Sequence, residues 1–537
     1  MLKLPKFFKL KNFGTWKFDL FFDIALFVTA FAVRMPWLWE VPRYIDELKE
    51  INLGYQIYLG KTFPLHNMAP EIGALHNYIL AGILKIFGVN LFLPRLYVTL
   101  TSALTVIVVY HLGKRLYNQW TGIIASCLLL TNGMHILVTH MAWSNCTTPF
   151  FFALAMLIVV IAEQKRSGKL LVVGGFLWAL TLQTHSSVII YLLVVSVYIL
   201  SPYFREKTNI PLKYYFLSGM AFTLGYANML YYNILSRGGS IGWIFVKDYT
   251  LEKHIGLTTF LRNFGQMLIQ LMRSLAAGYP TYSSILDYLK QPLFVICLFM
   301  MGLGVAASIR KRQFLPLWFI LGGFVIIPWI NHRYGFFIVT RYIMPVILCS
   351  TLILAYGFFR LLENVVPKEN PKLIIIPTLT VVLVAAFGAI HLTRFYSYCS
   401  NLANSDMSNR LSLRLVGITE KWARQNSVIL IDQRTHMKND PLPLLLTMNH
   451  RNYTVHRVIP SLKDGGKKDD PMIRALQRFQ GYGVIVIMSD PTYQELKRKV
   501  SMQKIKYLSE RLILNPSKLS VKEQPGIVRI YIAKVRS

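Results

Sequence analysis

Long apolar segments dominate this sequence and leave it few ways to fold. Hydrophobic residues make up 54% of the chain and charged residues only 15%. A membrane-spanning helix needs about 20 mainly apolar residues, and about eleven stretches approach that length, although several are short or interrupted. We therefore predict an α-helical, multi-pass membrane protein whose exact number of spans stays open. The predicted spans are 19–34, 93–112, 119–134, 147–162, 169–183, 186–201, 214–232, 291–309, 314–330, 342–359 and 373–391.

Positive charge is unevenly distributed between the loops. The chain has 58 basic and 25 acidic residues, a net charge of +33. Lys and Arg cluster in the N-terminal tail and in alternate short loops, such as those at 114–115 and 310–312, whereas the loops at 135–145 and 184–187 have none. Cytoplasmic loops carry such an excess, so we predict a cytoplasmic N-terminus. Basic loops also favour anionic membrane lipids, and no nucleic-acid motif is visible.

Three long segments then fall on the outer face of the cell membrane: 35–92, 233–290 and 392–537. The first span lacks a signal-peptide cleavage site, so we expect it to be retained as a helix. Amphipathic patterns in the first two outer segments predict helices that lie at the membrane interface. These patterns occupy 47–60, 69–87 and 260–275.

The composition changes after residue 391. Apolar runs of strand length alternate there with helical patterns, which is typical of an α/β domain. We predict a transmembrane domain at 1–391 and a small extracytoplasmic α/β domain at 392–537. The expected strands are 428–431, 453–459, 484–488 and 527–533, and the expected helices are 411–424, 472–480 and 492–500.

The five cysteines show no metal-binding or redox spacing, and three lie in predicted spans, so we predict no structural disulfide.

Asp23 lies inside the first span, where pairing with another helix explains it. Asp46 and Glu47 need a different explanation. They are adjacent carboxylates just beyond the first span of an acid-poor chain, and ionised groups near a bilayer tend to mark functional sites.

Several short motifs appear in an order that resembles a known group of enzymes. Arg34 closes the first span, Asp46-Glu47 follows, and Pro94-Arg95-Leu96 opens the second span. Further elements are His140 to Asn145, Gln183-Thr184-His185, and Arg341-Tyr342-Ile343-Met344-Pro345. This order is similar to that of the GT-C membrane glycosyltransferases, in particular the protein O-mannosyltransferase and aminoarabinose transferase group. These enzymes take a sugar from a polyprenyl-phosphate donor.

The resemblance implies a catalytic aspartate in the first outer loop, and Asp46 matches it. As general base, Asp46 would take the proton of an acceptor hydroxyl, and backside attack would invert the anomeric centre. Arg341 is the first candidate for binding the lipid phosphate, because guanidinium binds phosphate bidentately. Tyr342 could donate its hydroxyl to the same phosphate. Both residues could instead be ordinary interface side chains.

The remaining candidates for substrate binding are Glu47, Arg34, Arg95, His66, Asn145 and His185. Glu47 could hold a neighbouring cation or cap a helix, and Arg34 and Arg95 could contact phosphate or Asp46, or anchor helix ends. A divalent metal is possible, with His76 and Glu71 as candidate ligands. Many relatives carry a second acid where this chain has Ser144-Asn145, so a second carboxylate role there is in doubt.

Two other functions stay open at this point. One is a polymerase or ligase of lipid-linked glycans, which would rely on arginines and a histidine. The other is a transporter of lipid or polyprenol, although the paired halves common in transporters are not evident. The acceptor could be a lipid, a glycan or a protein. The sugar, a hexose or pentose, and the lipid length are not specified by the sequence.

Overall fold

The computed structural model is mostly helical, with one five-stranded sheet near the C-terminus. Two compact units are described separately: Met1–Pro36, Gly60–Ile79 and Leu96–Tyr396 form the first, and Trp37–Leu59, Leu80–Arg95 and Ser397–Ser537 form the second. The structure describes residues 15–41, 45–246, 256–276, 289–330, 337–365, 375–404, 409–423, 427–432, 442–449, 453–458, 471–479, 482–498, 500–512 and 526–535.

Helices occupy the described residues of each stretch that was predicted to span the membrane, apart from short breaks between helices. Two stretches are interrupted, because α5 gives way to α6 at Asn132 and α11 to α12 at Tyr226. The helices wholly or mainly in the first unit are α1 (Thr15–Arg34), α4 (Leu93–Leu116), α5 (Gln119–Thr131), α6 (Gly133–Val138), α7 (Thr148–Lys165), α8 (Gly168–Thr184), α9 (Val188–Leu200), α10 (Pro202–Thr208), α11 (Leu212–Gly225), α12 (Ala227–Leu235), α13 (Gly239–Val246), α14 (Leu257–Leu275), α16 (Pro292–Arg310), α17 (Leu315–Ile330), α18 (Met344–Val365) and α19 (Ile375–Ala403).

Four helical segments of the described chain are long and apolar enough to cross a membrane: Leu93–Leu116, Ser144–Lys165, Pro292–Arg310 and Thr340–Glu363. The bent pair α9 and α10 would make a fifth. The other stretches are shorter, more polar or interrupted, so the number of crossings stays a prediction.

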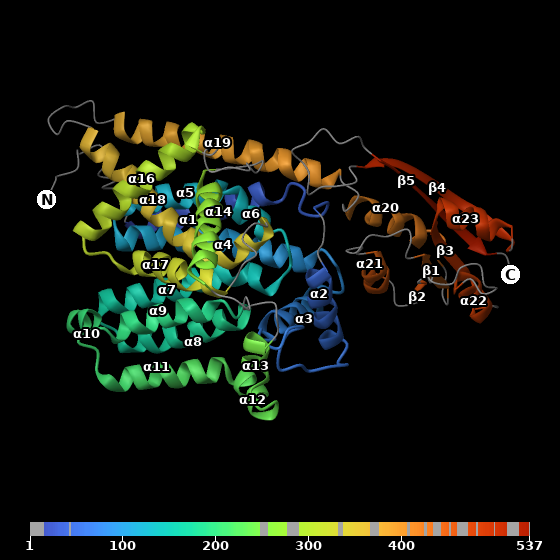
Figure 1. Ribbon diagram of the computed structural model, residues 1–537, viewed down its shortest axis with the longest axis horizontal. Helices are drawn as coiled ribbons and strands as arrows, with labels where there is room; N and C mark the ends of the chain where they lie inside the picture. The colour runs from blue at the N-terminus through green and yellow to red at the C-terminus, as the bar shows by residue number, and fades with distance from the viewer. Residues whose placement is uncertain are drawn as a thin grey trace. The chain divides into compact units, whose positions relative to one another are not determined.

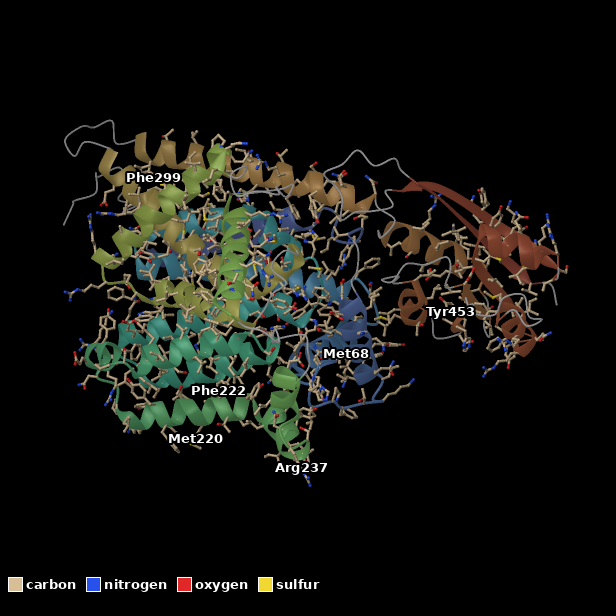
Figure 2. The ribbon with its side chains drawn as sticks, viewed as in Figure 1. Met68, Met220, Phe222, Arg237, Phe299 and Tyr453 are labelled. Carbon is tan, nitrogen blue, oxygen red and sulfur yellow. The ribbon has the colours of Figure 1, made fainter. Side chains whose placement is uncertain are left out.

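Helix α11 carries an exposed apolar stripe. Leu212, Phe216, Met220 and Leu224 recur every fourth residue and are 53–73% exposed, and Figure 2 marks Met220 on this helix. Contiguous exposed apolar surface of this kind is typical of contact with lipid.

Helix α14 covers the segment 260–275 that was predicted to be amphipathic. It packs against α16, α17 and α18 and buries Met267 and Leu271. Figure 1 shows it running across the direction of α8, α9 and α11, which lie alongside one another. An amphipathic helix is therefore confirmed, whereas its depth in a membrane stays a prediction.

Close helix packing in the first unit depends on small residues. A Cβ atom added to Gly304 of α16 would collide with the Ile353 carbonyl, and one added to Gly357 of α18 would collide with the Met300 carbonyl. Small residues allow helix backbones to approach in a membrane, where packing replaces the hydrophobic effect as the driving force.

Acidic residues of α1 pair with α4. Asp23 Oδ2 lies 3.0 Å from His111 Nε2, and Lys114 Nζ lies 2.6 Å from Asp19 Oδ2. Pairing with another helix, which was expected for Asp23, is thus observed.

The C-terminal part of the second unit is an α/β fold, as predicted. The strands β1 (Val428–Asp432), β2 (Thr454–Val458), β3 (Val484–Ser489), β4 (Met502–Leu512) and β5 (Gly526–Val535) take the order β2-β1-β3-β5-β4. Strands β2, β1 and β3 are parallel, and β5 runs antiparallel to β3 and β4. The accompanying helices are α20 (Asn409–Glu420), α21 (Leu442–Asn449), α22 (Pro471–Arg478) and α23 (Asp490–Lys497).

Strand β4 and helix α21 were not predicted. The sequence of β4 contains Lys504, Lys506 and Glu510 among its apolar residues, so it lacks the continuous apolar run of β1 or β3. This polar character suits a strand at the edge of a sheet, where charged side chains discourage further pairing.

Candidate active site

The first turn of α2 (Ile45–Tyr58), in the second unit, carries two adjacent carboxylates in contrasting environments. Asp46 is exposed and makes no hydrogen bond or ion pair with any described residue, whereas Glu47 is completely buried. Acidic groups in the first turn of a helix interact favourably with its dipole. The arrangement leaves the Asp46 oxygens accessible to a substrate and those of Glu47 inaccessible.

Glu47 forms a bidentate ion pair with Arg95. Arg95 Nε and Nη2 donate to the two Glu47 oxygens at 2.7 and 2.8 Å, and both side chains are fully buried. Arg95 Nη1 also donates to the carbonyls of Leu38 and Val41 at 2.6 and 2.9 Å. Within the second unit, the ion pair and these two hydrogen bonds therefore join Arg95 to the start of α2 and to the segment before it. Holding a neighbouring cation, one of the roles considered for Glu47, is what the structure shows.

Arg341 lies in the first unit, in the short 3-10 helix η3 (Phe337–Ile343) that precedes α18. Its guanidinium carbon is 4.3 Å from the centre of the Trp143 ring and 4.5 Å from that of Tyr342. Arg341 Nη2 also donates to the Tyr342 hydroxyl at 2.7 Å. Stacking on aromatic faces suits the planar guanidinium of arginine and not the ammonium of lysine. The two rings thus orient a cation that is only partly buried.

His185 is the C-cap residue that follows α8, and it joins this cluster. Its ring centre is 4.7 Å from that of Tyr342. Burial, and then the positive charge of Arg341, lower the pKa of His185 to about 3, so its imidazole is neutral near pH 7. Arg341 and Tyr342 from one predicted motif and His185 from another are therefore brought together.

Arg273 of α14 is a residue that the sequence reasoning missed. It is only 3% exposed. The Oε1 atom of Gln270 lies 3.5 Å from Arg273 Nη1 and 3.5 Å from the hydroxyl of Thr340, the neighbour of Arg341. An arginine on the buried face of an amphipathic helix was the signal that could have identified it.

The loop at 65–73 is held by hydrogen bonds to two helices of the first unit. Asn228 Nδ2 donates to the carbonyl of Leu65 at 2.7 Å and to Gln183 Oε1 at 3.2 Å. The Gly73 amide donates to the Gln183 carbonyl at 3.1 Å. A Cβ atom at Gly73 would lie 2.8 Å from Gln183 Cβ, which cannot swing aside as a side-chain end can, so this close approach requires glycine.

His66 and Asn145 are also in the first unit. The His66 ring packs 4.4 Å from the Tyr232 ring, and the side chain is half-buried. Asn145 is 8% exposed. No ring contact or hydrogen bond between described residues joins either of them directly to Arg341.

His76 is buried, and its Nε2 atom lies 3.2 Å from the carbonyl of Ala142. Within the described residues, no group of three or more His, Cys, Asp and Glu side chains is arranged to hold a metal ion. A metal role for His76 and Glu71 therefore stays a prediction.

Arg34 is fully buried and is held by neutral groups. It donates to Ser102 Oγ at 2.6 Å, to the Ala30 carbonyl at 2.9 Å and to His135 Nδ1 at 3.0 Å. No carboxylate of the described chain pairs with it. These contacts join α1 to α4 and α6, which fits the predicted anchoring of a helix end.

Comparisons with known proteins bear on the fold. Residues 73–231 match the family model described as dolichyl-phosphate-mannose-protein mannosyltransferase. The crystal structure of ArnT from Cupriavidus metallidurans bound to undecaprenyl phosphate has a TM-score of 0.59 and 12% identity, over 96% of this chain and 97% of its own. The chain has the GT-C fold. ArnT in the apo state aligns similarly, with a TM-score of 0.58 and 12% identity over 96% and 98% of the two chains.

A comparison with curated protein sequences finds no match. The GT-C fold and the family match together indicate a membrane glycosyltransferase. The fold class and the resemblance predicted from the sequence are confirmed. The match at 73–231 includes neither Asp46 nor Arg341, so their roles are matters for proposal.

Proposed function

We propose that this protein is an inverting glycosyltransferase that moves a sugar from a polyprenyl-phosphate donor to an acceptor hydroxyl on the extracytoplasmic face. The observation that carries the proposal is the contrast at the start of α2. Glu47 is fully engaged by Arg95, whereas Asp46 is exposed and unengaged among the described residues. The GT-C fold and the motif order around Asp46 support the same function.

In the proposed reaction, the carboxylate of Asp46 is the general base. The acceptor oxygen attacks the anomeric carbon while Asp46 takes the hydroxyl proton, and the bond between that carbon and the phosphate oxygen breaks. A well-placed general base typically accelerates such a step by about 10²–10⁴-fold. Attack from the face opposite the leaving group inverts the configuration.

The leaving group is a lipid phosphate whose negative charge grows as the bond breaks. Preorganised positive charge at that position stabilises the transition state. Trp143 and Tyr342 orient Arg341 before any substrate binds, so we assign to Arg341 the role of binding the lipid phosphate. Buried Arg273, connected through Gln270 and Thr340, adds positive charge nearby.

Glu47, Arg95 and Arg34 have supporting roles in this proposal. All three are fully buried and hydrogen-bonded within the protein. We therefore assign them to holding the starts and ends of helices rather than to contacting the sugar.

ArnT from Cupriavidus metallidurans is bound to undecaprenyl phosphate in its crystal structure, which makes polyprenyl-phosphate sugars the first donors to test. Purified protein is incubated with a panel of radiolabelled polyprenyl-phosphate hexoses and pentoses and with membrane extract. We expect one donor to yield a covalent product with lipid, glycan or protein, whose anomeric configuration is opposite to that of the donor. Retained configuration would contradict the inverting mechanism, and movement of lipid without a new glycosidic bond would indicate a transporter.

A further inference from the structure

The imidazole of His185 is fixed through one of its two nitrogens. Nδ1 lies 3.1 Å from the backbone nitrogen of Ser187, which donates to it, and 2.9 Å from Ser187 Oγ. A ring nitrogen that accepts a backbone N–H carries no proton, so the neutral ring holds its proton on Nε2. Nε2 makes no hydrogen bond with the described residues. The loop thus presents a donor and keeps the basic nitrogen occupied.

The neighbours of His185 are donors as well. The Tyr342 hydroxyl accepts a hydrogen bond from Arg341 Nη2 at 2.7 Å, which leaves its own proton available. The rings of His185 and Tyr342 lie 4.7 Å apart with an interplanar angle of 31°. Arg341, Tyr342 and His185 therefore form a group of donors, and such a group complements an anion with several acceptor oxygens.

We propose that His185 is a neutral hydrogen-bond donor to the phosphate of the lipid donor and of the leaving group, and that Ser187 is the positioning residue that sets its tautomer. This inference rests on the glycosyltransferase function proposed above. It also separates His185 from the proton transfer, because the nitrogen that could accept a proton is already engaged. The role of base is thereby left to Asp46.

Electrostatics favours a neutral group at this position. Arg341 is the charged group of the described chain that acts on the imidazole, and together with burial it lowers the pKa of His185. Protonation of His185 would carry a desolvation cost and repulsion from Arg341, whereas the N–H dipole of the neutral ring adds a hydrogen bond without adding charge.

Two substitutions at one position test the assignment. In His185→Gln the amide nitrogen can take the place of Nε2, whereas in His185→Asn it can reach only the place of Nδ1. We expect His185→Asn to weaken binding of radiolabelled undecaprenyl phosphate about ten- to a hundredfold, as for loss of a hydrogen bond to a charged group, and His185→Gln to restore it to within about threefold of wild type. Equal weakening by both variants, or by neither, would overturn the assignment.

The pH dependence gives a readout that a purely structural role would not change. The phosphate ligand itself changes its ionisation between about pH 5.5 and 8, and this affects wild type and variant alike. Dividing the wild-type dissociation constant by that of His185→Gln removes this common effect. We expect this ratio to stay constant between about pH 5.5 and 8, because a neutral donor does not titrate there. Tighter wild-type binding as the pH falls below about 6.5 would show instead that His185 acts as a cation.

The role of Ser187 is tested by Ser187→Ala and Ser187→Thr. Alanine keeps the backbone donor but loses the hydroxyl, so we expect about threefold weaker binding, and threonine should restore it. Wild-type binding by Ser187→Ala would remove the hydroxyl from the positioning role.

Arg341→Gln distinguishes failure of this inference from failure of the proposed function. If Arg341→Gln loses phosphate binding while His185→Asn behaves as wild type, only the assignment of His185 fails. If the wild-type protein neither binds undecaprenyl phosphate nor transfers a sugar from any polyprenyl-phosphate donor, the proposed function fails and this inference with it.

Discussion

The start of α2 and the segment that leads into α18 both carry charge, but they hold it in opposite ways. At α2 the buried Glu47 is fixed by Arg95, and the neighbouring Asp46 is left exposed without a partner among the described residues. Before α18 the charged group itself is fixed, because Arg341 stacks on Trp143 and Tyr342. A base needs a lone pair open to its substrate, whereas a group that stabilises developing charge works best when it is oriented in advance.

Removing the exposed carboxylate is the strongest test of this contrast. In Asp46→Asn we expect the rate of sugar transfer to fall about 10²–10⁴-fold, because the amide cannot take the acceptor proton. Donor binding should stay close to wild type, as measured with radiolabelled undecaprenyl phosphate. Glu206→Gln, which neutralises an exposed acid on α10, is the matched control. Transfer at wild-type rate by Asp46→Asn would remove Asp46 from the mechanism.

The buried carboxylate should affect stability instead. In Glu47→Ala the Arg95 charge stays buried without its carboxylate, so we expect the fold to lose about 3–5 kcal/mol of stability. The midpoint of thermal unfolding in detergent measures this loss. Lys49→Ala, an exposed position on the same helix, is the control. If both variants unfold at the same temperature, the ion pair does not stabilise the start of α2.

The oriented cation is tested by a change that keeps its charge. In Arg341→Lys we expect about tenfold weaker binding of the lipid phosphate, because an ammonium group neither stacks on two rings nor binds phosphate bidentately. Arg237→Lys, at the exposed turn between α12 and α13 (Figure 2), is the control. Unchanged binding by Arg341→Lys would mean that charge alone matters and that the aromatic rings do not contribute.

The smallest effect is expected at the tyrosine that contacts Arg341. Tyr342→Phe keeps the ring on which the guanidinium stacks and removes one hydrogen-bonding hydroxyl. We expect phosphate binding to weaken about two- to tenfold, as for loss of a single hydrogen bond. A loss as large as that of Arg341→Lys would show that the hydroxyl, rather than the stacking, orients the arginine.

Local patterns were enough to predict the long apolar helices and the α/β fold, but not helix α21 or strand β4. Apolar stretches such as 93–112 and 291–309 correspond to α4 and α16, because hydropathy depends on the residues of one segment alone. Strand β4 was missed because it is an edge strand with exposed lysines, and its own residues therefore give no strong apolar signal. Arg273 was missed because its burial depends on the helices packed around α14.

The order of the motifs identified Asp46, Arg341, Tyr342 and His185 as candidates. It could not predict which of these side chains are exposed or which residues they contact. The resemblance favours Asp46 over Glu47 as the base, but the sequence alone does not show how the environments of these adjacent acids differ. Only the contact with Arg95, 48 residues away, shows that Glu47 is engaged and Asp46 is not.

The sequence by itself determined that this chain is a helical membrane protein with an α/β region, because a bilayer selects long apolar helices by composition alone. The tertiary structure decided which charges are buried and which are exposed. It also decided that Arg341 meets Trp143, nearly two hundred residues earlier in the chain. Such contacts depend on how distant helices pack, and the local periodicity of a sequence carries no information about them.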